Sequence, residues 1–109
     1  MTHTVKTNGK LQILSLSGEI DMHSSPAARQ LILGLVKNNQ PLAVDLSAVS
    51  YMDSSGVATL VEGFQHAKKQ NQGFVLVAPS GSVLGVIKLA RLDKVFRIVS
   101  SLPECDDLA

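Results

Sequence analysis

A hydroxyl group beside a carboxylate, with glycine two residues further on, occurs in the segment Asp53-Ser54-Ser55-Gly56. Apolar residues recur with helical spacing from Ser54 onward, so the segment lies at the start of a predicted helix. The first turn of a helix presents unpaired N–H groups and positive partial charge, and a serine there could carry a phosphate at little structural cost. Aspartate and serine are also preferred helix caps. The residues alone therefore permit two interpretations: a phosphorylation site at Ser54, or a cap without further chemistry.

Other chemistry has little support in the sequence. The histidines are dispersed and lack the spacing of metal ligands: His3, His23 and His66. The G-x-S-x-G motif of a serine hydrolase is absent, although His23 could approach Ser54 through the loops. Gly81 and Gly85 do not belong to a phosphate-binding loop of the Walker type. We therefore expect no enzymatic activity, no cofactor and no metal ion.

Length and composition favour a single soluble domain. The chain has 109 residues, which suit one core, and its net charge of +1 gives no electrostatic footprint for nucleic acid. The longest apolar runs, such as residues 74–78, are far shorter than the ~20 residues of a membrane span. The first residues lack the apolar core of a signal peptide, and the single Cys105 cannot form an internal disulfide. We expect a cytoplasmic protein that neither binds nucleic acid directly nor inserts into a membrane.

Hydrophobic periodicity and turn residues divide the chain into strands and helices. Strand-like residues flank Asn8-Gly9, which suits a two-residue type I′ turn, so the chain is expected to open with a hairpin. Ser24-Ser25-Pro26 can start the first helix. Helices are predicted at about 25–38, 54–71 and 83–90, and further strands at 42–46, 74–78 and 95–99. Residues 100–109 are expected to form a loose tail or one helical turn.

The order strand-strand-helix-strand-helix-strand-helix-strand predicts an α/β fold. Right-handed crossovers give a mixed, mostly parallel sheet with packed helices, and the hairpin supplies an antiparallel edge. Residues 1–109 form one domain, with its core at about 5–99. Functional groups gather at the carboxyl ends of such strands, where loops 17–25, 47–56 and 79–82 should converge. Asp21 and Ser54 are therefore expected to be neighbours.

Three segments in this order resemble the STAS domain of bacterial anti-sigma-factor antagonists: Gly18-Glu19-Ile20-Asp21, Asp45-Leu46-Ser47 and Met52-Asp53-Ser54-Ser55-Gly56. The resemblance extends from about Val5 to Val99 and includes residues 86–93, which lead into Val95-Phe96. One feature departs from the family pattern, because only the ten residues 100–109 follow Val99, where the family usually has a longer C-terminal helix.

The resemblance implies a regulatory switch in which Ser54 is the phosphoacceptor. It further implies that a GHKL-type serine kinase, itself an anti-sigma factor, phosphorylates the antagonist, that a phosphatase reverses this, and that only the unphosphorylated protein binds the kinase. The surroundings of the phosphorylation site, which would contact the partner, are then Asp21, Asp53, Ser55, Gly56 and Thr59.

Several of these residues also have purely structural interpretations. Asp21 could cap the first helix, and Gly56 could simply allow a close approach of the backbone. Thr59 is expected on the helix surface rather than as a second phosphoacceptor. Asp45 is expected to end its strand facing solvent, and Ser47 to start a turn.

Two alternative functions remain open at this point. STAS domains also occur as small subunits that bind the ATPase of bacterial phospholipid-transport ABC systems, and as scaffolds in stressosome-like assemblies. The intact pair Ser54-Ser55 favours the switch, because the transport variants often replace these serines. An exposed sheet edge would allow a monomer or a weak homodimer.

Overall fold

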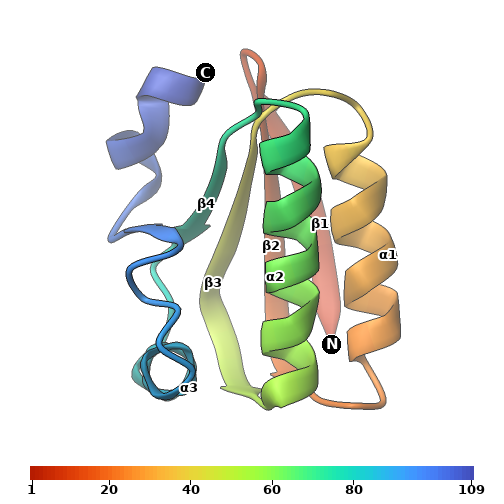
Figure 1. The fold of residues 1–109 in the computed structure, drawn as a ribbon, viewed down its shortest axis with the longest axis vertical. Coiled ribbons are helices and arrows are strands. Elements are labelled where there is room, and N and C mark those ends of the chain that lie inside the picture. Colours follow the sequence, from red (N-terminus) through yellow and green to blue (C-terminus); the bar gives the residue numbers. More distant parts are fainter.

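One five-stranded sheet runs through the computed structural model, which describes residues 1–109 (Figure 1). Its strands lie side by side in chain order: β1 Thr2–Asn8, β2 Leu11–Ile20, β3 Leu42–Met52, β4 Phe74–Val77 and β5 Arg97–Val99. β1 is antiparallel to β2, whereas the other neighbouring strands are parallel. This confirms the mixed, mostly parallel α/β sheet that the sequence predicts.

Three α-helices and a 3-10 helix complete the fold: α1 Ser25–Val36, α2 Ser54–Lys69, α3 Gly81–Leu89 and η1 Leu102–Leu108. α1 and α2 lie side by side over one face of the sheet (Figure 1), and an exposed two-point ion pair of Arg29 with Glu62 joins them. Alternate strand residues such as Leu42 and Val44 are buried beneath these helices. No helix combines the length and the apolar character needed to cross a membrane.

The N-terminal hairpin is present, but its turn lies one residue later than predicted. Asn8 pairs with Leu11, so the two turn residues are Gly9 and Lys10. Gly9 has a φ of 61°, whereas Lys10 is not among the residues with positive φ. A type I′ turn requires positive φ at both positions, so that prediction is wrong; glycine at the first position alone is typical of type II′.

Strand β3 is longer than the predicted 42–46 and continues to Met52. It accommodates two irregularities, because the pairing steps from Ser15–Asp45 to Ser17–Ala48, and later skips one more residue of β3. Each step places an extra residue in β3, as in a β-bulge. Asp45 therefore does not end the strand, and Ser47 does not start a turn. The Ser47 N–H instead donates to Asp45 Oδ1 at 3.0 Å within the first bulge.

The C-terminal residues are not the loose tail or single turn that we expected. η1 packs on the sheet face opposite α1 and α2, where Cys105 is fully buried. Its neighbours are the alternate strand residues that point away from the helices: Leu11, Ile13, Ala43, Val75 and Val77. Leu102 and Leu108 pack against the edge of this cluster. η1 thus covers this face of the sheet with only the residues Leu102–Leu108.

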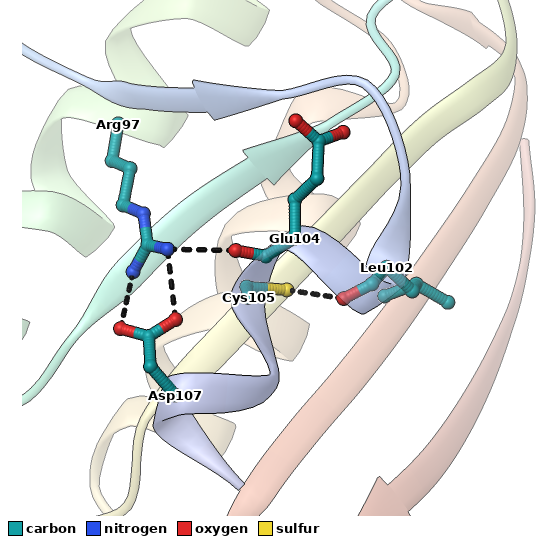
Figure 2. A network of polar contacts seen from close by, with 5 residues as sticks. All are labelled: Arg97, Leu102, Glu104, Cys105 and Asp107. Carbon is teal, nitrogen blue, oxygen red and sulfur yellow. Dashed lines mark hydrogen bonds and ion pairs between the residues drawn. The ribbon is translucent and has the colours of Figure 1, made fainter.

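Polar contacts fix the position of η1 (Figure 2). The Arg97 guanidinium donates to both carboxylate oxygens of Asp107 and to the Glu104 carbonyl, at 2.8 to 2.9 Å. The Glu104 carboxylate accepts the Ser101 N–H at 2.7 Å and forms a capping box with Ser101. The Cys105 thiol donates to the Leu102 carbonyl at 3.1 Å.

Candidate functional site at the start of α2

Asp53 caps helix α2. Its Oδ1 accepts hydrogen bonds from the backbone N–H groups of Ser55 at 2.9 Å and Gly56 at 3.4 Å, and from the Ser55 hydroxyl at 2.5 Å. The hydrogen bond from the Ser55 side chain is the main reason why the pKa of Asp53 lies below its usual value. Asp53 is therefore the cap that the structural interpretation of this segment expected, and the Ser55 hydroxyl is bound to that cap.

Ser54 differs from its two neighbours. It is the first residue of α2, it is exposed, and its hydroxyl makes no hydrogen bond in the structure, whereas the hydroxyl of Ser55 is bound to Asp53. The positive end of the helix lies next to this hydroxyl, although Asp53 already accepts the N–H groups of Ser55, Gly56 and Val57. Within this segment, Asp53 caps the helix, and Ser54 carries the hydroxyl that remains available for reaction.

Gly56 allows α2 to begin directly against the sheet. A Cβ atom at this position would lie 2.6 Å from Met52 Cγ and 3.0 Å from Ile20 Cγ2, both at the ends of neighbouring strands. No larger residue fits without moving these side chains. The close approach expected at Gly56 is confirmed, and it fixes Ser54 relative to β2 and β3.

Asp21 organises the loop between β2 and α1. Its Oδ1 accepts the N–H of His23 at 2.9 Å and of Ser24 at 3.1 Å, and the bond from Ser24 is the largest cause of its lowered pKa. Ser24, not Asp21, is the N-cap residue of α1, although its side chain makes no capping bond; its hydroxyl donates instead to the Glu19 carbonyl. The capping role considered for Asp21 is thus wrong.

The loops of Asp21 and Ser54 are neighbours, as predicted from the topology. The Asp53 N–H donates to the Ile20 carbonyl at 3.2 Å, which joins the two loops directly. The third expected loop also reaches this end of the sheet, because the Ser80 hydroxyl donates to the Val49 carbonyl at 2.8 Å. α1, α2 and α3 therefore all begin near the carboxyl ends of the strands (Figure 1).

Thr59 is not a surface residue. Only 7% of it is exposed, and its hydroxyl donates to the Ser55 carbonyl one turn earlier, at 3.1 Å. The backbone acceptor satisfies the hydroxyl, which permits its burial among apolar neighbours. The expectation of a surface position was therefore wrong, and Thr59 supports the first turn of α2 from within.

The sequence did not single out two exposed apolar residues near this site in the chain, Met22 in the Asp21 loop and Tyr51 near the end of β3. Met22 is 69% exposed in the loop of Asp21, and Tyr51 is 48% exposed near the end of β3. An apolar residue inside the polar loop Asp21-Met22-His23-Ser24 was the signal available for Met22. Tyr51 lies in the segment 47–56, which was predicted to be a loop, so the sequence did not indicate which face of a strand its side chain would occupy.

The family model of the STAS domain matches residues 3–105. The chain belongs to the STAS domain family. The anti-sigma-B factor antagonist of Bacillus subtilis is 31% identical, over 86% of this chain and 86% of its own length. The anti-sigma-F factor antagonist RsfB of Mycobacterium tuberculosis is 34% identical, over 94% of this chain and 84% of its own.

A solved structure of an anti-sigma factor antagonist has the same fold as this chain. The crystal structure of an anti-sigma factor antagonist from Mycobacterium paratuberculosis superposes with a TM-score of 0.87 at 35% identity, covering 94% of this STAS domain and 88% of that chain. The family and fold implied by the sequence segments around Asp21, Asp45 and Ser54 are thereby confirmed.

Proposed function

We propose that this STAS domain is a cytoplasmic anti-sigma-factor antagonist controlled by phosphorylation of Ser54. In this scheme it binds an anti-sigma serine kinase of the GHKL type while Ser54 is unmodified, and a phosphatase restores that state. The observation that carries the proposal is the exposed, unbonded hydroxyl of Ser54, which lies between the cap residue Asp53 and Ser55, whose own hydroxyl is bound to that cap. The names of the relatives support an anti-sigma factor as the partner.

Phosphoryl transfer from ATP requires only the Ser54 hydroxyl from this chain. Ser54 Oγ attacks the γ-phosphorus of ATP held by the kinase, the bond from that phosphorus to the bridging oxygen breaks, and ADP leaves. The hydroxyl proton must pass to a base. Asp53 is poorly suited to accept it, because its Oδ1 already accepts three hydrogen bonds and its pKa is lowered. The base therefore belongs to the kinase.

The helix can hold the phosphate without rearrangement. A phosphoserine adds roughly −1.5 to −2 charges, and the start of a helix stabilises such a charge by about 0.3 to 1 kcal/mol. No acidic residue lies within the first turn of α2 itself, and Gly56 and Asp53 keep that turn against the sheet. We infer that phosphorylation blocks the surface rather than changing the fold.

The same charge opposes binding of a partner. Asp53 already places a carboxylate beside Ser54, so a phosphate would give a concentrated negative charge at the centre of the contact. A ~100-fold loss of affinity needs only about 2.7 kcal/mol, which like-charge repulsion and desolvation at an interface can supply. The switch thus operates through electrostatics at the contact itself.

Phosphate incorporation provides the test. The purified chain is incubated with ATP and each anti-sigma serine kinase of the source organism, and the modified residue is located by mass spectrometry. Labelling is expected for wild type and for Ser55→Ala, and its complete loss is expected for Ser54→Ala. Labelling of Ser55 instead, or no labelling by any of these kinases, would refute the proposed switch.

A further inference from the structure

Among the large apolar side chains on the surface, Met22 lies in the loop that is bonded to the start of α2, whereas Tyr51 lies on the other face of the sheet. Met22 is 69% exposed and Tyr51 is 48% exposed. Tyr51 pairs with Glu19 near the ends of β2 and β3 and points away from the helices, because Met52 beside it is buried among them. Met22 stands on the loop that follows β2. The observation that distinguishes Met22 is its place in a polar loop beside the Ser54 hydroxyl, where a partner that reaches Ser54 would meet it.

The loop that carries Met22 is held firmly. Asp21 Oδ1 accepts backbone N–H groups from the residues that follow Met22, and the Asp21 N–H donates to the Ser24 hydroxyl at 3.0 Å. The Met22 N–H also lies close enough to the Asp53 carboxylate to contribute to its lowered pKa. Met22 is therefore fixed relative to the cap of α2, although its own side chain is free in solvent.

Resting on the function proposed above, we propose that Met22 is the apolar anchor by which the antagonist engages its kinase. The partner carries an apolar pocket beside its ATP site, and this pocket takes the Met22 side chain when the Ser54 hydroxyl reaches the γ-phosphate. A kinase that contacts Ser54 must also cover the loop joined to it through the Asp53–Ile20 hydrogen bond. Methionine is flexible and polarisable, which suits it to fill such a pocket.

The arrangement assigns different tasks to neighbouring residues. Met22 supplies apolar contact area. It therefore controls the affinity for the kinase and the choice among kinases. Ser54 supplies the reacting oxygen, and Asp21 acts as a positioning residue because it shapes the loop without pointing at Ser54. After transfer, the phosphate lies at the same surface and opposes the docking that Met22 favours.

Binding and steady-state phosphorylation by a purified anti-sigma serine kinase test this assignment. For Met22→Ala, the Kd for the ADP-bound kinase and the KM of phosphorylation are expected to rise at least about tenfold, with kcat unchanged. Met22→Leu, which keeps the apolar volume, should bind like wild type. Leu89→Ala is the matched control, because Leu89 is 87% exposed but lies at the far end of α3. It should leave the Kd and the KM unchanged.

The outcomes separate this inference from the proposed function. If wild type is bound and phosphorylated at Ser54 but Met22→Ala behaves identically, the anchor role of Met22 is refuted and the phosphorylation switch at Ser54 is not. The anchor is also wrong if Met22→Ala lowers kcat alone, or if Leu89→Ala is the sensitive variant. If wild type is neither bound nor phosphorylated by any anti-sigma serine kinase of the source organism, both are overturned.

Discussion

The Arg97 guanidinium binds both carboxylate oxygens of Asp107, with N–O distances of 2.9 and 2.8 Å. The pair connects the edge strand β5 to η1, and so places Cys105 over the sheet (Figure 2). Both side chains remain about half exposed, at 42% and 59%, so solvent screens the pair and its main effect is to orient η1.

Acid should weaken this attachment in a defined range of pH. Hydrogen bonds from Arg97 hold the pKa of Asp107 below its usual value of 3.8, so the pair stabilises the folded state above that value. This contribution is lost as the pH falls below 3.8 and through the lower pKa of the folded state. The urea midpoint of Asp107→Asn should therefore lie below that of wild type at neutral pH, and the difference should vanish in strong acid.

Asp106 offers the matched control for this prediction. It is exposed, adjacent to Asp107 and forms no ion pair. Asp106→Asn should therefore leave the urea midpoint close to that of wild type at both pH values. A difference between wild type and Asp107→Asn that persisted undiminished in acid would contradict the assigned ion pair.

The thiol of Cys105 should report whether η1 is docked. Burial raises its pKa and shields it, so it should react with a thiol reagent much more slowly in the native protein than in urea. Arg97→Ala should accelerate the native reaction, because η1 then opens more often. Lys94→Ala, an exposed residue without an ion pair, should react like wild type. Equal rates for all three proteins would show that Arg97 does not hold η1.

Replacement of two helical glycines by alanine should change the free energy of unfolding in opposite directions. In Gly56→Ala the new Cβ meets Met52 and Ile20, and overpacking of this kind costs about 1 to 3 kcal/mol of unfolding free energy. Gly85→Ala adds a Cβ in open space on α3 and should gain about 0.4 to 1 kcal/mol. Urea denaturation measures both changes. Similar stabilities for the two variants would contradict the close packing at the start of α2.

A carboxylate at position 54 should weaken partner binding only in part. Ser54→Asp adds one negative charge where a phosphoserine adds roughly −1.5 to −2, so the loss of affinity should be smaller than that of the phosphorylated chain. The thermal midpoint of the variant should stay near that of wild type, because position 54 is exposed at a helix start. Titration against the kinase and thermal melting check the two parts separately, and unchanged affinity would contradict the electrostatic switch.

Periodic segments were predictable from the sequence, and features set by tertiary contacts were not. The stripes of α1 and α2 and the cap at Asp53 are encoded locally, so their positions were confirmed. The bulges of β3 depend on register with β2, and burial of Thr59 depends on one hydrogen bond to Ser55. η1 lacks a clear apolar period; only its contact with the sheet explains why Cys105 is buried. The structure was needed to show that the Ser55 hydroxyl is bound to Asp53 while the Ser54 hydroxyl stays exposed and unbonded.

Because Asp53 caps α2 without the Ser54 side chain, a phosphate added to Ser54 would leave the folding equilibrium of the domain nearly unaltered. Modified and unmodified molecules would then be equally durable and equally resistant to proteolysis. Degradation would then not distinguish the two forms, so the total amount of antagonist would not depend on phosphorylation. Under the proposed switch, the opposing rates of phosphorylation and dephosphorylation would set only the fraction that is active, so a response could be reversed without making new protein.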